Sequence, residues 1–408
     1  MRRVLILVVF SVLYVSLPFI SFAEGSKPPE LVSFGYGDLL KIRESIRSGK
    51  GIYIESYNKL LASADQLLGK IPQKVTDGDM PPTGDAHDFF AIGKFSWPNP
   101  ATADGMPYVR RDGAHNKEAF GDRYDLTRFQ KTVNDINTLS LAWFYTQEEK
   151  YADKAKDLLN VWFVDTATRM NPNMNCASSL PGVYNGMSVG IIFSVILIEM
   201  VDHVKLLGLS KSWDTVSDEK LKKWFSDYLD WLNNSELGKQ ERAATNNHGT
   251  WYAAQAAAYY IYTGEKDKAR ALFTLSKTQV AGQVEKDGSM PRELKRVEAF
   301  HYFIYGLKAF VVLSRSMAIL GEDLSAYRTE DGRGLYLSFE FIIPYILGDK
   351  KWNHGGTVNL SEKGLFPAML WGYSRYQSPG MLKVLQHLTP AFTTSAGIDK
   401  LYVYRNAE

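Results

Sequence analysis

The sequence predicts an all-α protein in which antiparallel helix hairpins form a single α/α toroid, or incomplete barrel, with long lid loops. First, apolar residues recur at i, i+3, i+4 spacing through most of the chain, which is typical of helices with one buried face. Second, glycines end several of these segments, as Gly208, Gly264 and Gly321 do. Third, alternating strand patterns are scarce. Many helix pairs of similar length in one chain favour the toroid.

The predicted helices follow one another with few breaks. Short links such as 263–265 join them as antiparallel hairpins. No shift in composition marks a boundary, so we expect one domain over 24–408. In chain order, the predicted helices cover 37–68, 125–146, 148–163, 187–207, 217–233, 247–262, 265–284, 297–320, 326–347 and 362–376.

Two long segments interrupt this pattern. Residues 71–123 contain six prolines and six glycines, and residues 168–186 are polar and rich in asparagine. Long irregular segments inside a compact domain are usually lids or binding loops. We therefore expect both segments to cover a cleft, with Tyr108, Arg110 and Tyr184 as substrate contacts.

The N-terminus has the pattern of a secretory signal peptide. Arg2 and Arg3 precede an apolar run over 4–22, and Ser21 and Ala23 supply the small residues before a cleavage site. Cleavage after Ala23 leaves a periplasmic or secreted protein without stable membrane association. The chain has a single cysteine, so no internal disulfide forms and stability must come from the core.

Charge and composition exclude some partners. Without Arg2 and Arg3, 45 basic residues face 45 acidic ones, so no global field attracts nucleic acid. Any recognition of a charged polymer must be local. The chain has 23 Tyr, 21 Phe and 9 Trp among its 408 residues. Aromatic faces suit sugar rings, but they also fill ordinary helical cores.

The first candidate cluster lies at the start of a predicted helix, over 245–251. Its asparagines have the pattern of an N-cap, because their side-chain oxygens can accept the free amide protons of the helix. His248 then falls in the first helical turn, where the helix dipole favours a neutral imidazole that can act as a base. Trp251 shares its face by i+3 spacing. The alternative is a structural cap with a buried histidine.

The second cluster covers 287–302. A core seam is predicted for Val297, Phe300, Ile304, Leu307 and Val311, and Tyr302 lies about 160° from that seam by helical geometry. Tyr302 therefore points away from the seam. Arg296 and Tyr302 would stand about 120° apart on a continuous helix. They can meet at one site only if regular helix begins after Arg296.

Other kinds of site find little support. The seven histidines show no metal-ligand spacing such as HExxH, so we expect no metal and no other cofactor. The chain has no GxSxG elbow, P-loop or GxGxxG before a strand. Carboxylates are plentiful, so a glycosidase with paired acids stays open.

The two clusters together resemble the alginate lyase superfamily of α/α-toroid polysaccharide lyases. The resemblance rests on Asn247-His248, on Arg296 followed by His301-Tyr302, and on the upstream segments Trp97-Pro98-Asn99-Pro100 and 105–113. It implies a metal-independent enzyme that cuts a uronic-acid polymer by β-elimination. It further implies that Asn247, His248, Arg296 and Tyr302 are the catalytic residues, with Asn246 and Lys295 as competing candidates beside them.

The chemistry of β-elimination fits these residue types. A cation and an amide, Arg296 and Asn247, would neutralise the carboxylate next to C5 as charge develops. Tyr302 would act as acid and base where the C5 proton and the leaving group share a face, as in mannuronate or glucuronate. For guluronate, His248 would be the base. Tyrosine's ordinary pKa of about 10 means that nearby cations, Arg296 and Lys295, must stabilise its phenolate. Further substrate contacts are expected at Asn246, Trp251, Lys295 and His301.

Alginate is the substrate that this resemblance favours, and glucuronan or another glucuronate-containing glycan is the alternative. A toroidal glycoside hydrolase would instead need an essential carboxylate pair and would produce no unsaturated sugar. A non-catalytic glycan-binding protein would tolerate loss of Tyr302. We expect a monomer that binds an anionic polysaccharide.

Overall fold

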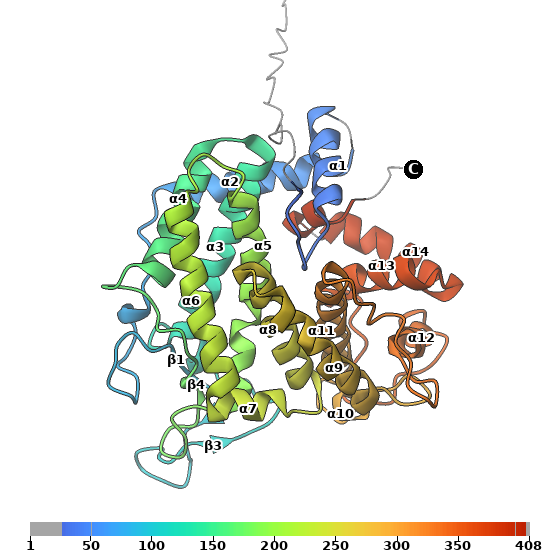
Figure 1. Cartoon of the computed structure of the whole chain (residues 1–408). Coiled ribbons are helices and arrows are strands. Elements are labelled where there is room, and N and C mark those ends of the chain that lie inside the picture. Colours follow the sequence, from blue (N-terminus) through green and yellow to red (C-terminus); the bar gives the residue numbers. More distant parts are fainter. Residues whose placement is uncertain (1–26, 50, 396, 405–408) are drawn as a thin grey trace, which may run out of the picture.

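The computed structural model describes residues 27–49, 51–395 and 397–404, so the predicted signal peptide lies outside the described residues. Antiparallel helices make up most of the molecule, and the few strands lie at its lower edge in Figure 1. The α-helices are α1 Tyr36–Arg47, α2 Ile54–Leu68, α3 Asp125–Thr146, α4 Glu149–Leu159, α5 Leu197–Leu207, α6 Thr215–Asn234, α7 Glu236–Arg242, α8 Asn247–Thr263, α9 Lys266–Gln283, α10 Pro291–Leu294, α11 Ala299–Ile319, α12 Leu335–Ile346, α13 Leu365–Tyr376 and α14 Pro379–Ser395.

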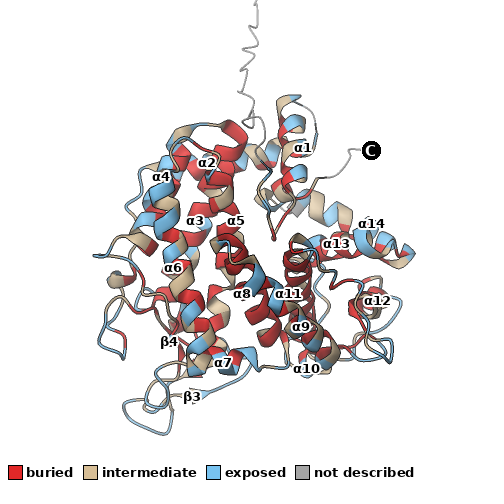
Figure 2. Cartoon of the chain, viewed as in Figure 1, coloured by how far each residue is buried: buried red, intermediate tan, exposed pale blue. Residues whose placement is uncertain are grey.

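Helices α8 and α11 form the centre of this arrangement. They pack against each other, and α8 also contacts α5, α6, α7 and α9. Nearly every side chain of α8 is buried, as Figure 2 shows in red. A helix that is apolar all round belongs inside a protein. By length and composition alone α11 could cross a membrane, but 72% of its most apolar window is buried, as in a core helix.

Helix ends follow the local signals in the sequence. Asn246 caps α8, its side-chain oxygen accepting the backbone N–H of His248 at 3.2 Å. Gly264 ends the same helix with a φ of 88°, a left-handed conformation that favours glycine. The predicted cap and stop of this helix are confirmed. The hairpin from α8 to α9 is also confirmed, because the two helices pack together across residues 264–265.

Several predicted boundaries are wrong. The segment 37–68 is two helices, because Gly49 and Gly51 adopt φ values of 66° and 104° between α1 and α2. The segment 187–207 begins as a 3₁₀ helix, Ser188–Ile196, and becomes regular only at α5. The segment 326–347 is helical only from Leu335, and sequence patterns missed α7 and α14 altogether.

The predicted core seam of α11 is right except at its start. Phe300, Ile304, Leu307 and Val311 are buried, whereas Val297 is 56% exposed. Val297 lies in the turn before α11, and regular helix begins only at Ala299. Helical periodicity therefore does not apply at that position.

The two irregular segments meet in small sheets. β1, Phe90–Ile92, pairs in parallel with β4, Cys176–Ser179, and Phe90 lies opposite Cys176. β2, Ser96–Trp97, pairs antiparallel with β3, Val109–Arg110. The link between β1 and β2 is held by the Gly93 backbone N–H, which donates to the Ser179 carbonyl at 2.9 Å. Segments 71–123 and 168–186 therefore form one layer at the edge of the toroid.

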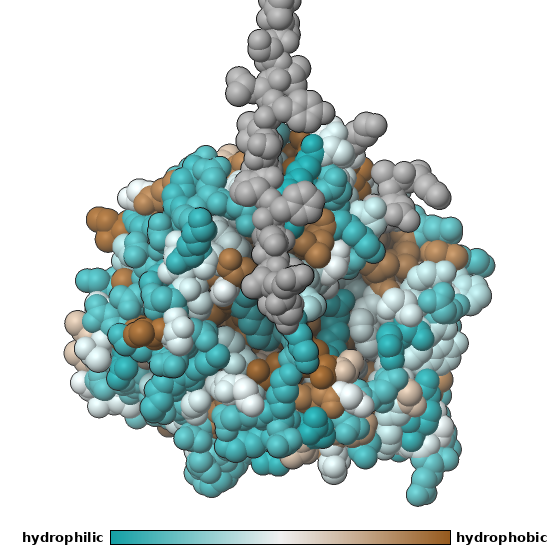
Figure 3. All heavy atoms as spheres, turned by 45° about the horizontal axis from the view of Figure 1, so that its top comes forward, coloured by the Kyte–Doolittle hydropathy of each residue, from teal (hydrophilic) through white to brown (hydrophobic). Residues whose placement is uncertain are grey.

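One large apolar core includes residues from Val32 to Val403, and a small satellite consists of Ile92, Ala119 and Tyr124. The C-terminal part of the described chain is held by side chains of the toroid. Tyr145 donates to the Leu401 carbonyl at 2.6 Å, and His203 lies 3.0 Å from the Tyr402 hydroxyl. In the view of Figure 3 the surface is largely hydrophilic, with scattered apolar side chains.

Candidate active site

The candidate catalytic residues lie where α8 and α11 begin. α10 packs against α11 and α7 packs against α8, so the N-terminal turns of both central helices share the lower edge of Figure 1 with β3. Arg296 occupies the turn between α10 and α11, and Tyr302 lies in the first turn of α11. Arg296 and Tyr302 could meet at one site only if regular helix began after Arg296. The structure has this arrangement, because α11 begins at Ala299.

Arg296 and Tyr302 are in direct contact. The Arg296 Nη2 donates to the Tyr302 hydroxyl at 3.0 Å, and the guanidinium carbon lies 3.8 Å from the centre of the tyrosine ring. The Tyr302 side chain is largely buried, with 8% exposed. This pair places a fixed cation beside a group that can transfer a proton.

Burial raises the pKa of Tyr302 above its ordinary value, and the carboxylates of Asp112 and Glu298 add to that rise. The guanidinium of Arg296 opposes it. Tyr302 is therefore a neutral phenol at neutral pH and can donate a proton. Arg296 is the cation that favours the phenolate, as predicted, whereas Lys295 is exposed and none of its described contacts reaches Tyr302.

The lid segment 71–123 supplies charges to this pair. Asp112 forms an ion pair with Arg296 at 3.2 Å. The Lys94 ammonium lies 5.9 Å from the centre of the Tyr302 ring and 4.8 Å from that of Phe95. Segment 71–123 therefore lies on the Tyr302 side of the molecule, as predicted. Segment 168–186 pairs with segment 71–123 through β1 and β4 and also contacts α6 through Trp224 and Trp231.

Lys94 was not singled out by the sequence patterns. Burial lowers its pKa, and the neighbouring Arg296 lowers it too, while Glu298 and Asp112 raise it. Within residues 27–49, 51–395 and 397–404, its ammonium has no hydrogen bond and no ion pair. A partly desolvated cation without an anion is costly unless an anion is bound there. Lys94 is thus available to an anionic ligand.

His248 is held by a buried carboxylate. Its Nδ1 lies 2.6 Å from the Glu241 Oε1, and Glu241 is only 2% exposed. The imidazole itself is 15% exposed, so the histidine is not fully buried. No sequence signal marked Glu241, because its helix, α7, was not predicted.

Asn247 faces inward in this structure. Its backbone N–H donates to the Glu293 Oε1 at 2.7 Å, and its Nδ2 donates to the Oε2 at 2.8 Å. Asn247 has an exposed fraction of 0%. The geometry therefore gives one N–H of this amide to Glu293, and the predicted contact of Asn247 with a substrate carboxylate stays a prediction. The neighbouring Asn246 is partly exposed and is the amide that faces outward.

Glu293 connects the two segments that carry the candidate catalytic residues. It belongs to α10, and burial raises its pKa, while the hydrogen bonds from Asn247 and the charges of His248 and Arg296 lower it. The same carboxylate thus holds the start of α8 and lies within electrostatic range of Arg296. Sequence analysis did not single it out.

The predicted substrate contact at Trp251 is wrong. It is 1% exposed and packs against Tyr305, with ring centres 5.0 Å apart, so it belongs to the core and offers no face to a sugar. His301 lies beside the site. Its ring centre is 5.2 Å from that of Tyr302, and its Nδ1 is 3.0 Å from the Glu362 Oε1.

The three predicted lid contacts stay untested. Tyr108 donates to Glu118 at 3.2 Å, and Arg110 and Tyr184 are exposed. Tyr108 and Arg110 belong to the loop and strand beside Trp97, and Tyr184 forms a bridge with Leu180. None of their contacts within the described ranges reaches Tyr302 or His248.

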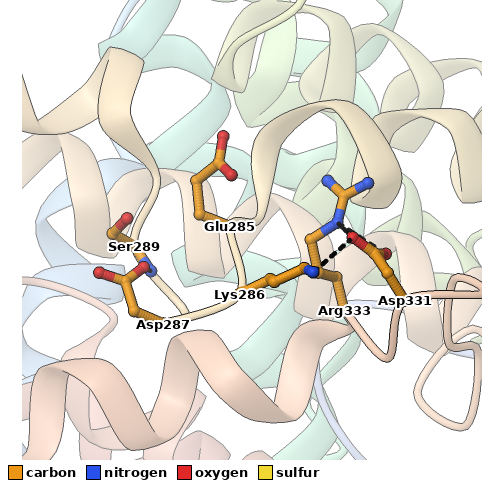
Figure 4. Close-up of a pocket in the computed structure, with 6 residues that line it drawn as sticks. All are labelled: Glu285, Lys286, Asp287, Ser289, Asp331 and Arg333. Atoms are coloured by element: carbon orange, nitrogen blue, oxygen red, sulfur yellow. Dashed lines mark hydrogen bonds and ion pairs between the residues drawn. The ribbon is translucent and has the colours of Figure 1, made fainter.

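A cavity lies away from these residues. It has a volume of about 560 Å³ and is lined by charged residues, as Figure 4 shows. Three of its charges are paired with one another, since Arg333 binds Asp331 at 3.0 Å and Lys286 lies 3.9 Å from Asp331. The lining contains no predicted catalytic residue. It consists of Glu285, Lys286, Asp287, Ser289, Asp331 and Arg333.

The site contains proton-transfer groups and cations. The part of the chain that the structure describes has no group of three or more His, Cys, Asp or Glu that could hold a metal ion. Tyr302, His248 and Arg296 are suited to moving a proton next to a negatively charged group.

Comparisons with known proteins agree with this arrangement. A family model described as alginate lyase matches residues 75–352. The structure of an alginate lyase from Bacteroides ovatus has 29% sequence identity and a TM-score of 0.82, covering 88% of this chain and 96% of that chain. A variant of alginate lyase A1-III complexed with a tetrasaccharide has 15% identity and a TM-score of 0.56, covering 91% of this chain and 95% of that one, which supports the fold alone. No curated protein sequence matches. The predicted α/α toroid is confirmed.

Proposed function

Since this chain belongs to the alginate lyase family of polysaccharide lyases, we propose that it cleaves alginate by β-elimination at the site formed by Tyr302, Arg296 and His248. The observation that carries the proposal is the contact between Arg296 and the Tyr302 hydroxyl at 3.0 Å. The partly exposed His248 is linked to this pair through Glu293, a carboxylate on which His248 and Arg296 both act electrostatically. The reaction removes the C5 proton, forms the C4–C5 double bond and releases O4.

Arg296 binds the carboxylate of the uronate that is cut. Negative charge spreads onto this carboxylate as the C5 proton leaves, and a fixed cation stabilises that charge more in the transition state than in the ground state. Lys94, whose ammonium forms no ion pair with any residue that the structure describes, adds a second positive charge. Asn246 is the partly exposed amide at the start of α8, while Asn247 orders Glu293.

Tyr302 protonates the leaving O4. Its raised pKa keeps it a neutral phenol, which is the form that donates. For mannuronate or glucuronate, where the C5 proton is on the same face, Tyr302 also removes that proton, and Arg296 favours the phenolate this requires. For guluronate the proton is on the opposite face, and His248 removes it.

Two arguments favour this function over a glycoside hydrolase. A hydrolase needs two carboxyl groups that face the substrate. Each carboxylate near the proposed site already has a partner: Glu241 holds His248, and Glu293 holds Asn247. Asp112 pairs with Arg296, and Glu298 lies 3.9 Å from His115. The family assignment agrees. We propose further that the protein acts in the periplasm or outside the cell, because of the signal pattern before Glu24.

The proposal is tested by ultraviolet absorbance of the new C4–C5 double bond. The mature protein is incubated with alginate, polymannuronate, polyguluronate, glucuronan and hyaluronan. We expect absorbance to rise on alginate and on at least one of its two homopolymers. A rise on glucuronan alone would assign the enzyme to that glycan, and no rise on any polymer would overturn the proposed function.

His248→Ala separates the two routes of elimination. If His248 is the base for guluronate, this variant should lose about 10²–10⁴-fold in rate on polyguluronate and far less on polymannuronate. Initial rates of double-bond formation on both homopolymers measure the difference. Equal losses on both would instead assign His248 to carboxylate binding or to orienting Tyr302.

Chelation should leave the activity unchanged. No step above requires a metal ion, so exhaustive treatment with a chelator, followed by removal of the chelator, should keep the rate on alginate within about twofold. Loss of activity that one divalent ion restores would contradict this expectation.

A further inference from the structure

We propose that Glu241 is a positioning residue that holds His248 in one tautomer, with the bare Nε2 available as the base. The inference rests on the proposed function and adds to it a carboxylate that does not touch the substrate. Three observations carry it: the contact between the two side chains, the burial of Glu241, and the close backbone packing that fixes their separation.

The contact between the two side chains is short. The Glu241 Oε1 lies 2.6 Å from the His248 Nδ1, and only 2% of Glu241 is exposed. Among the hydrogen bonds of the described residues, this is the one made by the Glu241 carboxylate. A buried carboxylate with a single partner is a poor anchor for stability, because its desolvation is hardly compensated. Its arrangement instead suits the orientation of that partner.

The backbone holds the two groups at this separation. α7 ends at Arg242 and α8 begins at Asn247, so a link of four residues joins them. At Gly249 a Cβ would lie 2.0 Å from the Ala244 carbonyl oxygen, and at Gly238 a Cβ would lie 2.0 Å from that of Leu232. Both close approaches require glycine. They hold α7 against the end of α6 and hold α8 against the link that follows α7.

A carboxylate fixes the tautomer of its histidine partner. It can only accept hydrogen bonds, so Nδ1 must carry the proton and Nε2 keeps its lone pair. Within the described ranges, Nε2 has no hydrogen-bond partner. Glu241 thus leaves the outer nitrogen as the one that can accept a proton.

The same pair stabilises the product of proton transfer. The C5 proton moves to Nε2, and the C5–H electrons form the C4–C5 double bond as the C4–O4 bond breaks. O4 takes a proton from Tyr302. His248 is then an imidazolium next to the Glu241 carboxylate, and this opposite charge lowers the energy of the state reached by proton transfer. Exchange of protons with water then returns His248 to the neutral imidazole and Tyr302 to the neutral phenol.

The first test needs no substitution. Nitrogen-15 shifts of the histidine rings report the tautomer, and His248→Ala identifies the signal of His248 by its loss. We expect the Nδ1–H form in the wild-type protein. An Nε2–H form would overturn the proposal, whether or not the enzyme cleaves any polymer.

The second test is Glu241→Gln, which keeps the shape but can either donate to or accept from Nδ1. We expect a mixture of tautomers and a fall in kcat on polyguluronate of about 10²–10⁴-fold, with KM little changed. On polymannuronate, where Tyr302 serves as base, the fall should be much smaller. Glu236→Gln is the matched control, since Glu236 is exposed in the same helix and pairs with Lys239.

The outcomes separate this inference from the proposed function. Glu241→Gln with wild-type ring shifts and wild-type kcat would show that Glu241 has only a structural role. A wild-type protein that yields no unsaturated product on any polymer would overturn the proposed function, while the ring shifts would still test the tautomer. If Glu241→Gln does not fold, Glu241→Asp takes its place, because the shorter side chain moves the carboxylate away from Nδ1. A mixture of tautomers with a reduced kcat on polyguluronate would support the proposal, and a mixture of tautomers with wild-type kcat would overturn it.

Discussion

Tyr302→Phe is expected to reduce the initial rate of double-bond formation by about 10⁴-fold or more on mannuronate-rich alginate. The substitution removes only the phenolic oxygen, so the buried ring keeps its packing beneath the Arg296 guanidinium. What is lost is the group that protonates O4 and, on mannuronate, also removes the C5 proton. A residue that serves both steps should lie at the upper end of the range for general acid–base groups. Initial rates on both homopolymers measure the loss.

Tyr305→Phe provides the matched control. Tyr305 follows Tyr302 by one turn of α11, is partly buried, and stacks on His301 with ring centres 5.8 Å apart. Removal of its hydroxyl should leave the rate within about twofold, since the hydroxyl is not assigned to any proton transfer. If Tyr302→Phe keeps more than about a tenth of the wild-type rate on every cleaved polymer, the role assigned to Tyr302 is wrong.

Arg296→Ala should cause the second largest loss, about 10³-fold or more in kcat/KM on every cleaved polymer. The variant removes the cation proposed to bind the substrate carboxylate, and it leaves the Tyr302 hydroxyl without its partner at 3.0 Å. Because burial already raises the pKa of Tyr302, loss of Arg296 should make the phenolate still harder to form. Both effects act in the same direction.

Arg296→Lys is the conservative variant for this measurement, and Arg270→Ala is its control. Arg296→Lys keeps the charge but loses the planar fork, so it should recover part of the activity. Arg270 is exposed on α9, where it pairs with Asp267, and its replacement should not change kcat/KM. An Arg296→Ala variant that stays within tenfold of the wild type on alginate would exclude Arg296 as the main counterion of the carboxylate.

Local patterns predicted most helices because caps, glycine stops and periodicity act within a few residues. The Asn246 cap and the Gly264 stop are examples. Periodicity failed where helices have no polar face. α8 is buried all round, so the i+3 spacing of Trp251 from His248 could not show which way Trp251 faces. The break between α1 and α2 at 48–53, and the start of α12 at Leu335 and not at 326, depend on turns that helical periodicity does not detect.

The candidate site was predicted only as far as it is local in sequence. Arg296 and Tyr302 are six residues apart, and the turn before α11 brings them into contact. Lys94, Glu241 and Glu293 reach the site from other elements, so no spacing rule connects them to it. Asn247 shows the limit of a motif, since its position was predicted but its hydrogen bonds to Glu293 were not.

The central claim is that this protein breaks its polymer by elimination, without adding water at the cut. The most direct measurement is mass spectrometry of alginate products formed in water enriched in oxygen-18. We predict unsaturated uronate at each new non-reducing end and no oxygen-18 fixed in the cleaved linkage beyond ordinary exchange at reducing ends. Saturated ends, with products heavier by one labelled water for each cut, would contradict elimination and assign the toroid to a hydrolase.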